Sequence, residues 1–191
     1  MADKADKLWN KKNWNIRLVT PAATASWCHL DKTEVIDGDE TNKYSITLVL
    51  PAAAPETLQF VNKYLEIKSQ CQQLVDKDFG NEGYKMGEDG SYEFKFKSKR
   101  KPVVVDSKKN LVTERVMGGA KVKCIVKPWF YTGLGGGVSL QLVSVQVLEM
   151  SDGDAAASDM FDEEDGFESS GNQPSDGHYD TDDTDDTSDF D

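Results

Sequence analysis

Residues 121–150 read KVKCIVKPWFYTGLGGGVSLQLVSVQVLEM, and this stretch decides the fold. Apolar side chains recur at every second position in two runs, residues 121–131 and 138–150, which is the period of a half-buried β-strand. The glycine-rich residues 133–137 lie between the runs and predict a hairpin loop. In the second run the parity of the apolar residues changes after Leu142, which predicts a β-bulge or a barrel corner.

Three further segments upstream carry clear patterns. The apolar, β-branched run YSITLVL at residues 44–50 and the strictly alternating YEFKFK at residues 92–97 are predicted strands. Between them, apolar residues recur at helical spacing from Pro55 until Gly80. This spacing predicts one main α-helix at about residues 55–79.

The remaining segments have weaker patterns. Short strands are predicted at residues 15–19 and 26–30, and extended segments at residues 103–105 and 111–116. Residues 1–13 are polar and are predicted to be mobile. The order of these elements predicts a mostly β protein with an OB-fold, a small antiparallel Greek-key barrel whose helix follows the third main strand.

The charge divides the chain into two unlike parts. The whole sequence has 34 acidic and 22 basic residues, a net charge of -12. Residues 151–191 hold 16 of the acids and no Lys or Arg, so residues 1–150 carry 22 basic against 18 acidic residues, a charge of +4. We therefore predict a single OB-fold domain at residues 1–150 and a disordered acidic tail at residues 151–191.

No motif for catalysis or metal binding is visible. Cys28, Cys71 and Cys124 lack the spacing of zinc ligands, and neither His29 nor His178 has a partner that would form a triad. We expect a non-enzymatic protein without metal or cofactor. The sequence shows neither a signal peptide nor a run of about 20 apolar residues. These features predict a cytoplasmic protein without membrane association.

Basic residues concentrate in residues 95–127, which contain eleven Lys or Arg and two acids. Such an excess favours phosphate binding, in which each neutralised phosphate releases condensed cations. The densest cluster lies at residues 95–101. Lysines that merely solvate a loop and a strand edge are an equally good interpretation of that cluster alone.

The predicted strand at residues 121–131 favours binding, because its outward face is both basic and aromatic. Aromatic side chains stack on the exposed faces of unpaired bases, while lysines follow the backbone, so single strands are the expected ligand. The alternative is that Trp129 and Tyr131 turn inward past Pro128. Trp9 and Trp14 repeat the basic and aromatic pattern near the N-terminus. The candidate DNA-binding residues are Lys95, Lys97, Lys99, Arg100, Lys101, Lys121, Lys123, Lys127, Trp129 and Tyr131.

The acidic tail allows two roles that follow from its charge. It can occupy a basic groove as a phosphate mimic, and it can dock on basic partner surfaces with Phe190 as an apolar anchor. The candidate partner-binding residues are Asp185, Asp186, Asp189, Phe190 and Asp191.

The stretch at residues 118–150, together with an acidic tail that ends near an aromatic residue, resembles the T7-like phage single-stranded DNA-binding proteins. Residues 44–51, before a helix, are similar too. The resemblance implies an OB-fold and the coating of single-stranded DNA in phage replication, recombination and repair. It also implies tail contacts with the phage DNA polymerase and the helicase or primase. Those proteins typically end on the aromatic residue, whereas here Asp191 follows Phe190.

The leading hypothesis is therefore a phage single-stranded DNA-binding protein in the host cytoplasm. Two alternatives stay open. The chain could be an acidic-tailed chaperone or assembly factor for basic proteins, or it could bind RNA, because recognition of the 2′-OH leaves no sequence signature. The sequence does not decide between a monomer and a homodimer.

Overall fold

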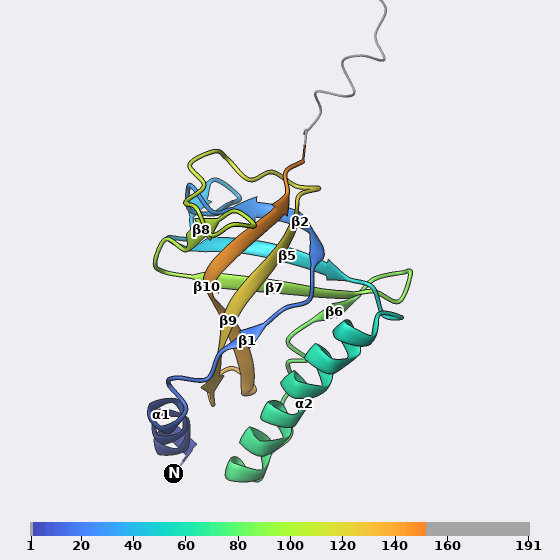
Figure 1. Ribbon diagram of the computed structural model, residues 1–191. Coiled ribbons are helices and arrows are strands. Elements are labelled where there is room, and N and C mark those ends of the chain that lie inside the picture. Colours follow the sequence, from blue (N-terminus) through green and yellow to red (C-terminus); the bar gives the residue numbers. More distant parts are fainter. Residues whose placement is uncertain (1, 152–191) are drawn as a thin grey trace, which may run out of the picture.

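The computed structural model describes residues 2–151, and the two helices and ten strands within them form one barrel with its attachments (Figure 1). From residue 152 on, the predicted tail and its candidate partner-binding residues lie outside the described part. In chain order the elements are α1 (Ala2–Lys12), β1 (Leu18–Val19), β2 (Ala23–His29), β3 (Val35–Ile36), β4 (Asp39–Glu40), β5 (Tyr44–Leu50), α2 (Pro55–Val75), β6 (Lys85–Met86), β7 (Tyr92–Ser98), β8 (Val103–Val105), β9 (Lys121–Tyr131) and β10 (Gly137–Glu149).

Five strands close into a barrel in the order β9-β2-β5-β7-β10, and β10 returns to pair with β9. The neighbours are antiparallel except at the closure, where β10 runs parallel to β7 with Gln141 opposite Lys97. The short strands β1, β6 and β8 pair with β9, β7 and β10. The mostly β, OB-type barrel predicted from the sequence is confirmed.

The interior of the barrel follows from the alternation of apolar residues. Phe94 and Phe96 on β7 are buried, and the charged residues between and beside them point outward. The helix α2 covers one end of this core: Phe60 and Tyr64 meet Phe94 edge to face, with ring centroids 5.3 and 5.7 Å apart. Each of these large side chains contributes about 1.5–3 kcal/mol by leaving water.

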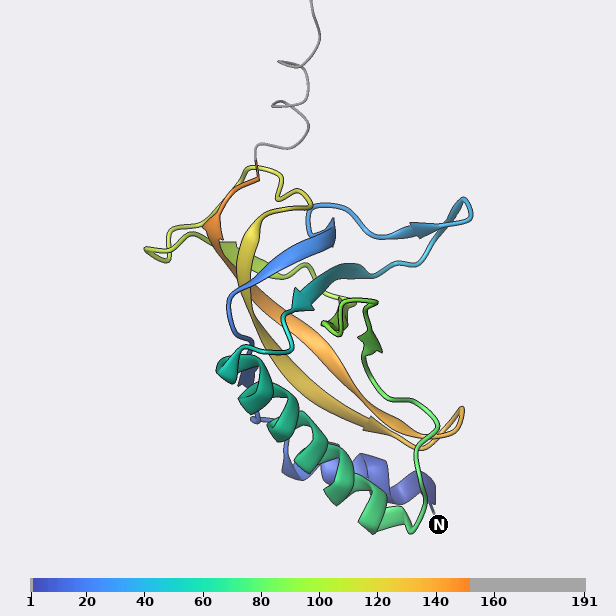
Figure 2. The same ribbon diagram turned by 90° about the vertical axis from the view of Figure 1, so that its right-hand side faces the viewer.

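The hairpin of β9 and β10 is the longest feature of the sheet and extends past the barrel, where α1 contacts β9 and α2 contacts β10 (Figures 1 and 2). The parity change is confirmed as a bulge: the register of β10 against β9 shifts between Leu142 and Ser144. Val143 is the extra residue and is exposed, while Val145 and Val147 are buried again. The bulge keeps apolar residues inside on both sides of the bend.

Two details differ from the sequence prediction. The helix α2 follows the second barrel strand and not the third, because β1 is a two-residue edge strand that does not belong to the closed barrel. Residues 111–116 do not form a strand and contribute one isolated bridge, from Leu111 to Val105. Both errors have the same cause. Residues 15–19 and 111–116 were each counted as a strand, although too few of their residues form backbone hydrogen bonds with a neighbouring strand.

The prediction of a mobile N-terminus is wrong. Residues 2–12 form α1, whose Trp9 is buried against Phe130 with ring centroids 6.3 Å apart. Trp9 is therefore part of the core and not a second aromatic binding site, whereas Trp14 beyond the helix is exposed. A single apolar residue among lysines is a weak sequence signal, yet one buried indole is enough to fix a short helix on the barrel.

One edge of β9 is closed by a side chain in place of a strand. Among the described strands, β1 pairs with β9 at Val126 and Ile125 and reaches no further. At Phe130, Asn10 of α1 takes over: its Nδ2 donates to the carbonyl oxygen at 2.8 Å, and its Oδ1 accepts from the N–H at 3.0 Å. Alternate residues of a strand face the same neighbour, so the nitrogen of Pro128 also points to this edge, where a missing N–H costs no ladder bond.

The change Asn10→Ala should lower the free energy of unfolding by about 2–4 kcal/mol, because it leaves two buried backbone groups without partners. Urea denaturation followed by circular dichroism measures the loss. Asn15→Ala, at an exposed position nearby, should change stability by no more than about 0.5 kcal/mol. Equal losses in the two variants would show that the Asn10 pair does not hold the edge.

Candidate nucleic-acid interface

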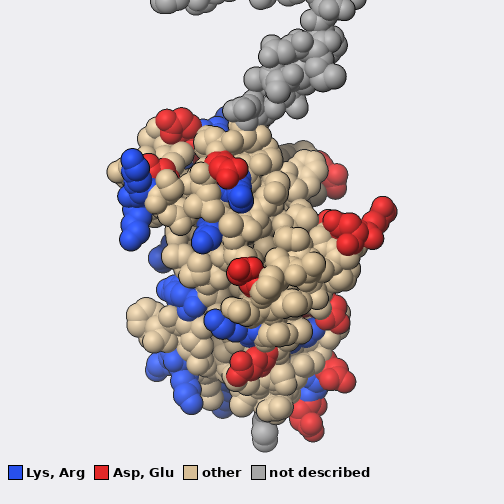
Figure 3. Space-filling view, turned by 45° about the vertical axis from the view of Figure 1, so that its right-hand side comes forward, with Lys and Arg blue, Asp and Glu red and all other residues tan. Residues whose placement is uncertain are grey.

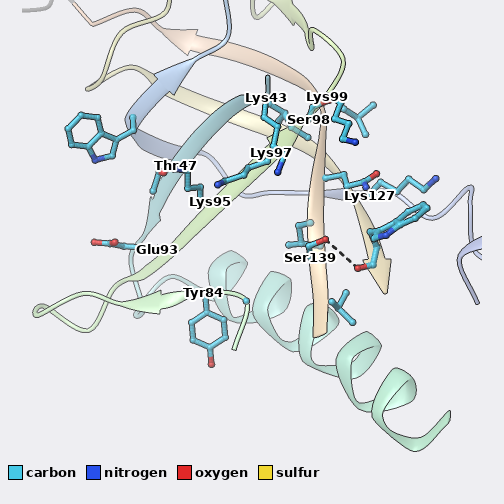
Figure 4. Close-up of a pocket in the computed structure, with 18 of the residues that line it drawn as sticks. Lys43, Thr47, Tyr84, Glu93, Lys95, Lys97, Ser98, Lys99, Lys127 and Ser139 are labelled. Atoms are coloured by element: carbon cyan, nitrogen blue, oxygen red, sulfur yellow. Dashed lines mark hydrogen bonds between the residues drawn. The ribbon is translucent and has the colours of Figure 1, made fainter. Parts of the chain in front are cut away.

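A groove of about 1360 Å³ crosses the outer face of the barrel, over parts of β2, β5, β7, β9 and β10 (Figure 4). We call it the basic groove. It brings together eight of the ten candidate DNA-binding residues predicted from the sequence. These are Lys95, Lys97, Lys99, Arg100, Lys101, Lys127, Trp129 and Tyr131.

The strand register explains why residues so far apart in sequence share this face. Cross-strand partners lie on the same face of a sheet, about 5 Å apart. Thr47 of β5 has Trp27 of β2 on one side and Lys95 of β7 on the other. One step along, Gln141 of β10 joins Lys97 of β7 to Lys127 of β9. Closing the barrel therefore brings side chains from all five barrel strands onto one continuous surface.

The strand β9 presents the predicted mixture of basic and aromatic groups to this surface. Burial alternates along its whole length, and Pro128 and Phe130 are inside while Trp129 is 39% exposed. The alternative in which the two aromatic residues turn inward is wrong, because Pro128 stays in register with β10. The ammonium group of Lys127 lies 5.7 Å from the ring centroid of Trp129, at the distance of a cation–π contact.

The remaining two candidates, Lys121 and Lys123, lie outside the basic groove. Lys121 forms an ion pair with Glu149 at 3.4 Å, between exposed side chains. The two lysines are on the outward face of β9, as predicted. They lie near the opposite end of the strand from Trp129 and Tyr131, and each residue between adds about 3.3 Å. The twist of β9 around the barrel turns that end away from the groove. The sequence showed on which face of the strand Lys121 and Lys123 lie, but not where along the barrel that part of the strand runs.

The groove also contains residues that the sequence reasoning missed, chiefly Trp27, Lys43, Tyr84 and Lys85. Trp27 is 69% exposed and follows a register shift in β2 between Ala25 and itself, so its face could not be read from simple alternation. Lys43, directly before the predicted strand at residues 44–50, and Tyr84, directly after Gly83, were visible in the sequence. Neither forms a pattern without the fold.

The charge of the groove is strongly positive. Counted over the described residues, its lining has nine Lys or Arg side chains and one acid, Glu93. In Figure 4 the side chain of Lys43, which precedes β5, lies near those of Lys95 and Lys97 on β7. On the face shown in Figure 3, most basic side chains lie toward the left, whereas acidic side chains predominate along the right edge.

A buried carboxylate lies behind the groove. Glu34 precedes β3, is 5% exposed, and binds Lys95 through a hydrogen-bonded ion pair. Its second oxygen lies 3.6 Å from the ammonium group of Lys97. Burial acts to raise the pKa of Glu34, but the hydrogen bond from Lys95 and the charges of both lysines outweigh it and hold the pKa below its ordinary value.

Comparisons with known proteins give structural matches only. No protein-family model matches the sequence, and no curated protein is significantly similar to it. A single-stranded DNA-binding protein of bacteriophage T7, gp2.5, superposes with a TM-score of 0.62 at 21% identity, over 78% of this chain and 98% of its own. The single-stranded DNA-binding protein of bacteriophage Enc34, in complex with single-stranded DNA, matches with a TM-score of 0.60 at 20% identity, over 71% and 88%.

The chain has the fold of these phage proteins. A C-terminally truncated form of the Enc34 protein also matches, with a TM-score of 0.56 at 21% identity. The matched share of this chain is close to the part described here, which excludes residues 152–191. The resemblance noted in the sequence is thus confirmed at the level of structure.

One wall of the groove is a loop, residues 80–84, that α2 holds in place. The hydroxyl of Tyr64 lies 3.0 Å from the carbonyl oxygen of Glu82 and 2.9 Å from that of Val138. Lys68, buried on the same helix, pairs with the Glu82 carboxylate at 3.0 Å. Burial raises the pKa of Tyr64 far above its ordinary value, so its hydroxyl remains a donor. At the groove itself, Asn81 donates to the Tyr131 hydroxyl at 3.0 Å.

Metal chemistry finds no support in the described residues. Within residues 2–151, no group of three or more His, Cys, Asp or Glu side chains is arranged to hold a metal ion. Burial raises the pKa of Cys28 to about 11, so that thiol is protonated at neutral pH. In the same part of the chain, no helix is both long and apolar enough to cross a membrane.

The change Gly83→Ala should destabilise the loop that forms the groove wall. Gly83 has φ +84, and a Cβ there would lie 1.8 Å from the hydroxyl of the buried Tyr64. Gly38→Ala is a matched control, because Gly38 has φ +88 and nothing within 4 Å of its Cβ position. Both variants carry a backbone cost of about 1–2 kcal/mol, and Gly83→Ala should lose a further 1–3 kcal/mol, roughly, through overlap. Equal losses in urea denaturation would contradict the close packing of Tyr64 on the loop.

Proposed function

We propose that this protein binds single-stranded DNA without sequence preference and coats it during phage replication and recombination. The observation that carries the proposal is the basic groove, in which exposed Trp27 and Trp129 stand among lysines on the outer face of an OB-type barrel. Lysines attract the phosphates, and the indole rings offer stacking surfaces for bases. The fold shared with phage single-stranded DNA-binding proteins supports the same assignment.

Single strands fit this groove better than a duplex because of its aromatic residues. Base pairs hide their faces in the stack of a double helix, so Trp27 and Trp129 could contribute little to duplex binding. With an unpaired strand each stacked base gains about 1–3 kcal/mol. The role proposed for the groove is binding without catalysis, as in the phage single-stranded DNA-binding proteins that share the fold.

We further propose that the acidic tail competes with DNA for the groove and recruits partner proteins. Residues 151–191 carry 16 acids and no Lys or Arg, and the groove lining carries nine basic side chains, so the two are complementary in charge. The partners implied by the resemblance are the phage DNA polymerase and the helicase or primase. Docking through Phe190 and its neighbouring aspartates would leave the groove to the DNA.

Trp27→Ala and Trp129→Ala should each weaken binding to oligo(dT) by about 5- to 150-fold, because each removes one stacking surface. Fluorescence anisotropy with a labelled oligo(dT), repeated at several salt concentrations, measures the loss. Trp14→Ala is the matched control, since Trp14 is exposed but lies outside the groove. Affinity for duplex DNA equal to that for oligo(dT) in the unchanged protein would refute the single-strand assignment, and tighter binding of oligo(U) would redirect it to RNA.

Deleting residues 152–191 should tighten oligo(dT) binding at low salt and have less effect at high salt, because a tethered polyanion competes electrostatically. All residues described in the structure remain in this variant. Unchanged affinity at low salt would remove the competitor role. A truncated protein that binds no DNA at all would favour the alternative, an acidic-tailed chaperone for basic proteins.

A further inference from the structure

Glu34 is the one buried acid that touches the lysines of the basic groove in the part of the chain described here. Its side chain is 7% exposed, whereas those of Lys95 and Lys97 are 40% and 41% exposed. The carboxylate therefore lies behind the two ammonium groups as seen from solvent. A phosphate can approach the lysines from the open side without displacing it.

The backbone holds Glu34 firmly in this position. Its N–H donates to the carbonyl oxygen of Lys43 at 2.8 Å, and its own carbonyl oxygen accepts from the N–H and the hydroxyl of Thr41, each at 2.9 Å. These bonds close the base of the β3–β4 hairpin, which projects from the barrel in Figure 2. The acid is thus built into the fold and is not a surface side chain that swings away when DNA arrives.

Glu34 carries its negative charge under all ordinary conditions. The titratable groups that act on it are, in decreasing order, Lys95 and Lys97 on β7 and His29 on β2. All three favour the ionised carboxylate, and together they outweigh the effect of burial. Lys95, Lys97 and Glu34 together carry a net charge of +1.

Other basic residues of the groove differ from Lys95 and Lys97. Among the ion pairs formed within residues 2–151, none involves Lys99, Arg100, Lys101 or Lys127. These four keep their full charge for phosphates. Lys95 lies two strands from Trp27, about 10 Å away, with Thr47 of β5 between them.

We propose that Glu34 is an internal counter-anion that cancels one of the two lysine charges of Lys95 and Lys97, so that the groove neutralises one phosphate fewer than its lysine count implies. The inference rests on the DNA binding proposed above and deepens it. Glu34 is a positioning residue: it acts on DNA only through Lys95 and Lys97. It lowers affinity and salt dependence below what the lysine count alone would give.

The test is Glu34→Gln in the full-length protein, which keeps the shape and a carbonyl acceptor for Lys95 but removes the charge. One further phosphate should then be neutralised, which steepens the slope of log K against log salt by about 0.7 for a single strand. Binding of oligo(dT) should tighten about eightfold at 50 mM salt and about threefold at 200 mM. Glu149→Gln is the matched control, because it removes the same charge from a Lys–Glu pair outside the groove.

An unchanged or weaker affinity of a folded Glu34→Gln protein overturns the inference, as does an equal gain in Glu149→Gln, which would be an effect of net charge alone. Should Glu34→Gln fail to fold, two double variants decide the matter in its place. The slope should fall by about 0.7 for Lys95→Gln/Lys97→Gln, because the cluster neutralises one phosphate, and by about 1.4 for Lys101→Gln/Lys127→Gln, whose lysines have no acidic partner among the ion pairs of the described residues. Equal falls in the two double variants overturn the inference. If the unchanged protein does not bind oligo(dT) at any salt, the proposed function fails and this inference with it.

Discussion

The pairing of β10 along both of its edges is the constraint on which the rest of the structure depends. One edge runs antiparallel to β9, and the other meets β7 and β8 in parallel. A straight strand could not satisfy both edges and still keep its apolar residues inside, so the bulge at Val143 is required. With the barrel closed, the outward side chains of five strands form one face, and the basic groove is a consequence of that closure.

In a closed barrel the inward side chains stabilise the protein, and the outward side chains form the groove. Phe94 and Phe96 fill the interior from the same strand that presents Lys95 and Lys97 to solvent, so core packing does not limit the outward charge. Repulsion between lysines on the same face of a strand limits the outward charge, and Lys95 and Lys97 are two residues apart on β7. Glu34 relieves that repulsion by pairing with both. In the role proposed for it, the same carboxylate would also restrain the affinity for DNA.

The sequence predicted those features that depend on the period of a single strand. Alternation identified β7, β9 and their outward lysines, and the parity change located the bulge in β10. Features that depend on contacts between distant segments were not predictable. Asn10 meets Phe130 across 120 positions, and Glu34 meets Lys95 across 61. Trp27 escaped for a different reason, because the register shift in β2 removes the alternation from which its face would have been read.

The sequence identity to the phage proteins is only about 20%, yet the fold is shared. This follows from the same division between inward and outward side chains. Inward positions require only apolar side chains of suitable volume, so many sequences build the same barrel. Outward positions are free to change, and the contacts of one protein cannot be transferred to another by fold alone. The groove of this chain must be understood from its own residues. Its two exposed indoles, Trp27 and Trp129, stand on β2 and β9. Lys95 and Lys97 of β7 lie between them along the row of strands β2, β5, β7, β10 and β9, and Glu34 pairs with both lysines.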